Sequence, residues 1–137
     1  SYLAMTRRSP YIDDHKHEGE EGTGFATMRI IGRKYLFIYP FVKTNEWYQL
    51  PKGERQALMN EHFVIGHNYP DVKISTAYSF GLDDQEFVLG FETDNPSNFL
   101  DLVMELRESK ARPYTLIDNP IFSCISKSVE ACMGDLG

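Results

Sequence analysis

The stretch "VKISTAYSFGLDDQEFVLGFET" (residues 72–93) decides the fold. The segments on either side of "GLDD", residues 72–80 and 85–93, are rich in β-branched and aromatic residues, and "GLDD" itself is a tight-turn sequence. In residues 85–93, Phe87, Leu89 and Phe91 alternate with residues of the opposite face, which is typical of a strand with one side in a core. The stretch therefore predicts a β-hairpin.

A helix is predicted before this hairpin. Pro51 fits the first turn of a helix, and Pro70 would stop it after Tyr69. One stripe at helical spacing is formed by Leu58, His62, Ile65 and Tyr69. This stripe predicts which side of the helix faces the sheet.

A second helix is predicted after the hairpin. In "DNPSNFLDLVMELRES", Asn95 is a good N-cap and Pro96 suits the first helical position. Its apolar stripe consists of Phe99, Val103 and Leu106. The hairpin is thus flanked by two amphipathic helices.

Two further strands complete the pattern. "KYLFIYPFV" (34–42) is typical of a buried strand, in which Pro40 favours an edge or a bulge near the end, and "YTLIDNPIFSCIS" (114–126) is an interrupted last strand. The resulting order, β-α-β-β-α-β over residues 34–126, is that of an α+β ferredoxin-like unit with an antiparallel sheet and both helices on one face. Such a unit is half of a dimeric α+β barrel, so the free sheet face predicts a homo-oligomer or a missing half. Residues 1–33 are expected to hold the end of a preceding strand plus an acidic linker, and residues 127–137 a C-terminal tail.

Composition narrows the class of protein. The chain has 137 residues, 42% of them hydrophobic, and no apolar run near the roughly 20 residues that span a bilayer. A net charge of -6 argues against nucleic acid as a partner. Two cysteines, Cys124 and Cys132, form no disulfide framework and favour a reducing compartment. With no visible signal peptide, a cytoplasmic location is expected.

Five segments, in this order, resemble the chlorite dismutase superfamily, and within it the coproheme decarboxylases. They are "YPFVK" (39–43), "EWYQL" (46–50), "NEHFVIGHNY" (60–69), "YSFGLDDQEF" (78–87) and "FLDLVMELRESKA" (99–111). The resemblance runs over roughly residues 1–126. It implies a heme-binding protein similar to the peroxide-dependent coproheme decarboxylases of heme synthesis, either cytoplasmic or, in a photosynthetic eukaryote, in the plastid stroma.

The resemblance also implies roles for particular residues. His62 would bind the iron of heme b or iron coproporphyrin, since a neutral imidazole is a good iron ligand. Tyr39 would become the radical that abstracts hydrogen from a propionate in the presence of hydrogen peroxide, and Lys43 would assist it. Arg107 would bind a propionate through its guanidinium fork. Trp47 would be a further cofactor contact.

The chain departs from the family pattern in three places. The glutamate that usually orients the proximal histidine is replaced by Lys110 or Ala111, which predicts a weaker electron donor to iron. Residues 73–75, "KIS", stand where chlorite dismutases carry a distal arginine, and the distal glutamine of many decarboxylases is missing too, so chlorite chemistry is not expected. Family subunits contain two ferredoxin-like halves. This chain matches the second, so it is either a fragment or a protein whose partner chain supplies the other half-barrel.

For the histidines, the residues alone leave other interpretations open. His62 would ordinarily be a buried histidine bonded to backbone. His67 points about 140° away from it on the helix and is expected to be exposed. His15 and His17 lie in the acidic segment and could bind adventitious zinc or nickel, although no third ligand is fixed.

For the other site residues, Tyr39 and Trp47 would ordinarily be core aromatics, and Lys43 and Arg107 solvated charges at element ends, with Arg107 well placed at a helix C-terminus. Three functions therefore remain open. The chain is a peroxide-dependent coproheme decarboxylase, a heme-binding or regulatory protein with little turnover, or a heme-free structural subunit of the same fold.

Overall fold

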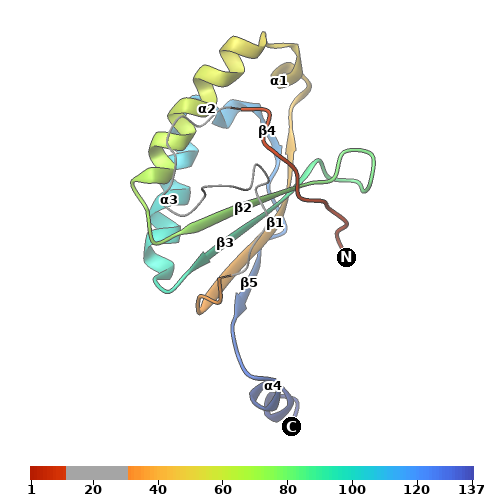
Figure 1. Ribbon diagram of the computed structural model, residues 1–137, viewed down its shortest axis with the longest axis vertical. Coiled ribbons are helices and arrows are strands. Elements are labelled where there is room, and N and C mark those ends of the chain that lie inside the picture. The colour runs from red at the N-terminus through yellow and green to blue at the C-terminus, as the bar shows by residue number, and fades with distance from the viewer. Residues whose placement is uncertain (12–30) are drawn as a thin grey trace.

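The structure, a computed structural model, describes residues 1–11 and 31–137 and contains one antiparallel sheet in the order β2-β3-β1-β4, with β5 also paired to β1 (Figure 1). The strands are β1 (Tyr35–Lys43), β2 (Lys73–Tyr78), β3 (Phe87–Thr93), β4 (Thr115–Ile117) and β5 (Phe122–Ile125). This strand order is that of the ferredoxin-like unit. The predicted hairpin is β2 and β3, in which Ala77 pairs with Val88.

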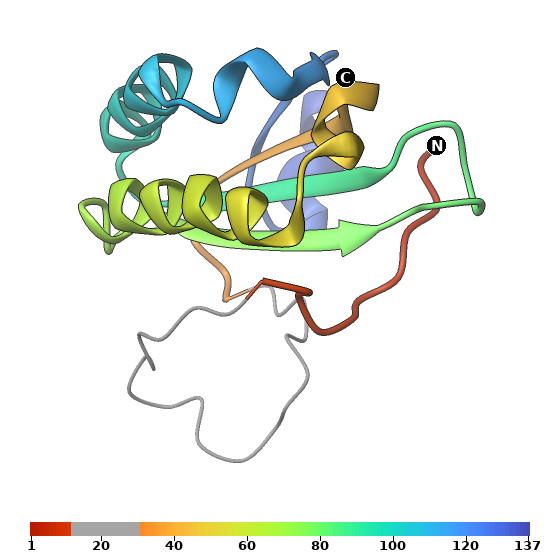
Figure 2. The same ribbon diagram turned by 90° about the horizontal axis from the view of Figure 1, so that it is seen from above.

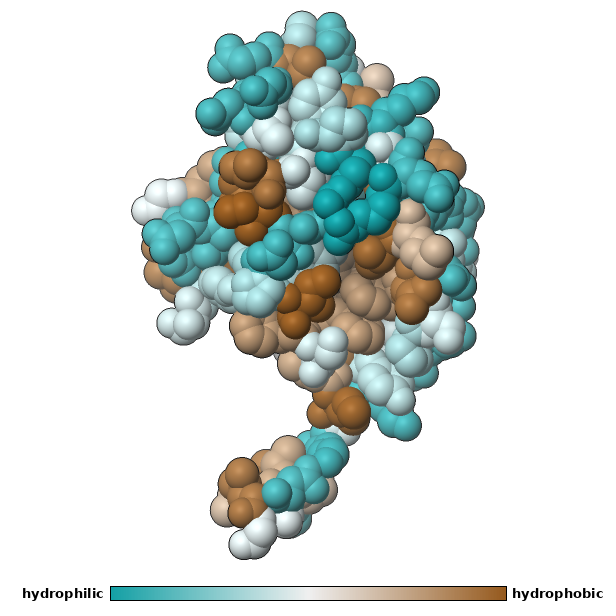
Figure 3. All heavy atoms as spheres, turned by 180° about the vertical axis from the view of Figure 1, so that it is seen from behind, coloured by the Kyte–Doolittle hydropathy of each residue, from teal (hydrophilic) through white to brown (hydrophobic). Residues whose placement is uncertain are grey.

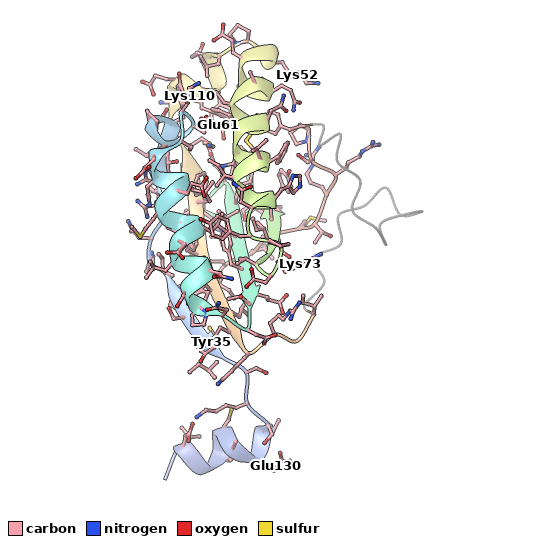
Figure 4. The ribbon with its side chains drawn as sticks, turned by 90° about the vertical axis from the view of Figure 1, so that its left-hand side faces the viewer. Tyr35, Lys52, Glu61, Lys73, Lys110 and Glu130 are labelled. Atoms are coloured by element: carbon pink, nitrogen blue, oxygen red, sulfur yellow. The ribbon has the colours of Figure 1, made fainter. Side chains whose placement is uncertain are left out.

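Two helices, α2 (Lys52–His67) and α3 (Pro96–Glu108), lie side by side over one face of the sheet, as Figure 4 shows with the strands behind them. Helix α3 begins where its sequence predicts, because the Asn95 side chain accepts a hydrogen bond from the Ser97 backbone N–H at 3.1 Å. The predicted α+β class with both helices on one face is confirmed.

The core lies between this sheet face and the two helices. Its buried members are Tyr39, Ile65, Val72, Phe91, Phe99 and Leu102. The Tyr39 ring stacks on Phe91 with centroids 5.5 Å apart, and the Phe37 ring stacks on Phe99 at 4.0 Å. Alternate residues of β1 therefore point at the helices, as the period of two predicts.

Strand β1 changes partner at Pro40. Before it, residues 35–38 pair with β5, and after it Val42 and Lys43 pair with β4. Residues 118–121, between β4 and β5, leave this flank of β1 unpaired, which suits a proline that has no N–H to donate. Of the two alternatives that Pro40 favoured, an edge is excluded because β1 is central, and a register shift falls between Val42 and Lys43.

The two ends of the chain differ from expectation. The N-terminal "SYLAMTR" forms no strand; only Met5 makes an isolated bridge, to Tyr78, where the N-terminal stretch passes the β2 edge (Figure 2). The predicted C-terminal tail contains helix α4 (Val129–Asp135), which Ser128 caps and which stands off the sheet (Figure 1). The local cap explains α4, since the Ser128 hydroxyl accepts a bond from an otherwise unpaired N–H.

Two short elements between the main ones were not predicted. They are α1 (Asn45–Gln49) and the 3₁₀ turn η1 (Arg112–Tyr114). The predicted acidic segment lies, from residue 12 onward, outside the described residues. No helix in the described part of the chain is long and apolar enough to cross a membrane.

Candidate functional site

Tyr39 is placed by β1 on the helix-facing side of the sheet. Only 7% of it is exposed. Burial raises the pKa of the Tyr39 phenol to about 12; the charge of Asp118 raises it as well, while Arg107 and Arg112 oppose the increase. At neutral pH this phenol therefore keeps its hydrogen, close to one negative and two positive side chains.

Lys43 ends the same strand, with its ammonium nitrogen 4.3 Å from the centroid of the Trp47 ring and 5.1 Å from that of Phe41. Burial lowers the pKa of Lys43 to about 8, Glu86 opposes this change, and Arg112 adds to it. Lys43 is thus a cation held in an aromatic environment, with its proton bound less tightly than usual.

Glu86 fixes the end of β1 to α1. One of its oxygens accepts bonds from the Lys43 backbone N–H at 2.8 Å and from the Tyr48 hydroxyl at 2.5 Å. From the sequence, Glu86 was only one of the residues that alternate with Phe87, Leu89 and Phe91. The alternation along "QEF" could not reveal a partner 43 positions earlier in the chain.

Trp47, on α1, is 2% exposed. Its ring contacts Tyr11 and Tyr114 edge-on or tilted, with centroids 6.1 and 5.7 Å away, and carries the Lys43 ammonium on its face. These contacts make Trp47 a core aromatic that supports Lys43.

His62 lies half-buried on α2. Burial, with the positive charge of Lys43 second, lowers the pKa of His62 to about 4, and Glu61 opposes the shift. Among the residues that the structure describes, no hydrogen bond to this imidazole is found, so the alternative of a histidine bonded to backbone has no support. At neutral pH the ring is uncharged and has a lone pair to offer. His67, predicted to be exposed, is half-buried; that prediction was wrong.

Lys110 stands where the family usually has a glutamate, and its backbone makes a contact with α2. The Lys110 N–H donates to Glu61 at 3.1 Å, which ties α2 to the residues that follow α3; both side chains are marked in Figure 4. Glu61 precedes His62 but makes no hydrogen bond to its ring. The imidazole therefore has no carboxylate that orients it within the described residues.

Arg107, in the last turn of α3, is an ion-paired side chain. Its guanidinium lies 3.0 Å from an oxygen of Asp118, and Arg112 donates to the same oxygen at 2.5 Å. Sequence reasoning missed Asp118 and Arg112. The available signal was the break in the last strand at "IDNP", which predicts a polar loop beside β1 but not its partners.

A pocket of about 510 Å³ opens between β1, β5 and α3. Tyr39 and Arg107 line it together with mainly apolar side chains, among them Phe37, Phe99, Val103 and Ile121. Figure 3 shows apolar and polar side chains adjoining on the face that carries α3 and the β4–β5 edge. His62, Lys43 and Trp47 do not line this pocket.

The predicted site residues thus form two adjacent groups, Tyr39 with Arg107 at the pocket and Lys43 with Trp47 and His62 beyond it. The charge of Arg112 acts on both Tyr39 and Lys43 and so links the groups. Within residues 1–11 and 31–137, no three His, Cys, Asp or Glu side chains are arranged to hold a metal ion. The histidines predicted to bind adventitious metal, His15 and His17, lie outside the described residues.

Known proteins match most of this chain. It is 37% identical over 102 residues to a coproheme decarboxylase of Mycolicibacterium smegmatis, covering 74% of this chain and 44% of that protein. A heme-binding protein from Thermus thermophilus superposes with a TM-score of 0.73 at 28% identity, over 79% of this chain and 46% of the other. The chlorite dismutase of Candidatus Nitrospira defluvii in complex with imidazole superposes with a TM-score of 0.71 at 28% identity, over 78% and 46%.

The chain therefore spans about half the length of these relatives. The profile of the chlorite dismutase family matches residues 1–127, which include every element of the sheet and each predicted site residue. This chain belongs to the chlorite dismutase family.

Proposed function

We propose that this chain is a heme-binding protein whose His62 binds the iron of heme b or iron coproporphyrin. The observation that carries the proposal is the His62 imidazole, which is half-buried, uncharged at neutral pH and without a hydrogen bond in the described residues. An imidazole in this state is the form that ligates iron. The relatives named for heme binding and for coproheme decarboxylation support the same ligand class.

The surrounding residues fit a porphyrin that carries carboxylates. The pocket beside Tyr39 and Arg107, which His62 does not line, offers apolar walls to one edge of the ring, and the cations Lys43, Arg107 and Arg112 suit propionates. The Trp47 ring lies against the Lys43 ammonium group and keeps water from that side of it. The protein thus offers one ligand for iron, apolar contacts for the porphyrin ring and cations for the carboxylates of that ring.

The reaction that we propose is the peroxide-dependent oxidative decarboxylation of iron coproporphyrin. When bound, the iron porphyrin supplies the oxidising chemistry with hydrogen peroxide. Tyr39 holds its phenolic hydrogen in a buried position until it is oxidised, and Lys43 holds a propionate carboxylate by charge. Tyr39 and Lys43 are four residues apart on one strand and so face the same side.

One observation favours a second candidate, a heme-binding protein with little turnover. Within residues 1–11 and 31–137 no carboxylate accepts a hydrogen bond from His62, and position 110 is a lysine whose backbone N–H donates to Glu61. A proximal histidine without such a partner is a weaker electron donor to its metal. This difference lowers the expected rate and leaves binding intact.

Absorbance titration with iron coproporphyrin and with hemin tests the binding. The wild type should develop a Soret band that His62→Ala loses and that His67→Ala, altered on the same helix, retains. Hydrogen peroxide is then added, and the mass of the porphyrin product is measured by mass spectrometry. Loss of two carboxyl groups, abolished in Tyr39→Phe, supports the enzyme; a stable complex without product supports the second candidate. If neither porphyrin binds, only a heme-free structural subunit remains.

We further propose that the binding unit is completed by a second copy or by a partner chain that supplies the other half-barrel. Exposed apolar residues along the β4–β5 edge support this, namely Leu116, Ile117, Ile121, Phe122 and Ile125. Sedimentation velocity of the purified chain should give at least a dimer, or a monomer that a copurifying chain converts to a complex. A cytoplasmic or plastid-stromal location stays a prediction.

A further inference from the structure

Asp118 occupies an unusual position between two guanidinium groups. It lies in the loop between β4 and β5, beside the unpaired flank of β1, and only 15% of its side chain is exposed. A single oxygen, Oδ2, serves Arg112 at 2.5 Å and Arg107 at 3.0 Å. The two arginines come from different elements, η1 and α3, so that this carboxylate is their shared partner.

One of these two arginines lines an apolar pocket. Arg107 lines the cavity of about 510 Å³, whose walls include Phe37, Phe99 and Val103. Both side chains retain exposure, 43% for Arg107 and 32% for Arg112. Positive groups beside an apolar cavity recognise amphipathic carboxylates, and guanidinium matches a carboxylate in shape.

We propose that Arg107 and Arg112 form a carboxylate cradle and that Asp118 is an internal carboxylate that fills it until a porphyrin propionate displaces it. The inference rests on the proposed function and names the contact through which that ligand enters. Asp118 then opposes binding, because the ligand must break the charged hydrogen bond to Arg112 and the ion pair with Arg107 before it makes its own contacts.

Displacement has a second consequence, at Tyr39. The Asp118 charge is among the causes that keep the Tyr39 proton bound, and the two arginines act in the opposite direction. A propionate in the cradle would replace one negative charge by another, and the charge balance around Tyr39 would be conserved. In the free protein, Asp118 therefore gives Tyr39 the same negative neighbour that a propionate would give it in the porphyrin complex.

The test compares Asp118→Asn with the wild type in titrations with iron coproporphyrin. Asparagine keeps the shape of the side chain and removes its charge, so the affinity should rise by up to about fivefold, the range expected for a partly exposed ion pair. Iron coproporphyrin tetramethyl ester, which has no ionised carboxyl group, should bind both proteins equally. Asp135→Asn, the same charge change on the distant α4, should leave both affinities unchanged.

A second variant and a structural check keep the outcome interpretable. Arg112→Gln should weaken the binding of iron coproporphyrin and leave that of the ester unchanged, and circular dichroism should show that each variant retains its fold. If Asp118→Asn weakens binding, or changes both porphyrins alike, Asp118 is not a displaced competitor and the inference is wrong. Failure of the proposed function is a separate result, in which His62→Ala and the wild type give the same spectrum with either porphyrin.

Discussion

Acid should destabilise this chain through His62. The ordinary pKa of this side chain is 6.5, and in the folded protein burial lowers the pKa to about 4. Between these values the unfolded chain takes up a proton that the folded chain does not. His62 therefore costs no stability above the ordinary pKa, and its destabilising effect grows as the pH falls to the folded value. A shift of this size corresponds to about 3 kcal/mol, a large part of the roughly 5–15 kcal/mol that hold a domain folded.

Urea unfolding at about pH 7.5 and about pH 4 measures this effect against His62→Gln, which does not titrate. Carboxylates contribute equally to both proteins and cancel in the difference. The wild type should lose about 3 kcal/mol more than the variant on acidification. Equal losses in the wild type and in His62→Gln would show that the ring is hydrated in the folded state, and the argument for an uncharged iron ligand would fall.

Two further predictions concern the core and the cation of β1. Leu102→Ala should cost about 2–5 kcal/mol in urea unfolding, because the side chain is fully buried, whereas Leu100→Ala, 57% exposed on the same helix, should cost under about 1 kcal/mol; similar costs would place the core elsewhere. NMR titration of the lysine side chains should find a midpoint near 8 for Lys43, and Glu86→Gln should move that midpoint lower, because the Glu86 charge raises the pKa. An ordinary lysine midpoint near 10.5 in both proteins would contradict the buried position.

Local patterns predicted the main elements of the fold. The alternation in residues 87–93 and the "GLDD" turn indicate a hairpin, and the structure contains it as β2 and β3. Asn95 and Pro96 mark the start of α3 because a cap is a contact between residues two positions apart. The family resemblance, carried by short ordered motifs, pointed to the family that the profile match shows.

The partners of the site residues required the tertiary structure. Asp118, in the loop after β4, meets Arg107 of α3 where the helix packs beside that edge of the sheet, and Glu86 meets Lys43 where β1 pairs with β3. The uncharged state of His62 depends on burial and on a lysine from another element. Periodicity and capping act between neighbours in the chain, so one sequence displays them. Burial, ion pairing and pKa depend on groups that only the packing of helices against the sheet brings within a few ångströms.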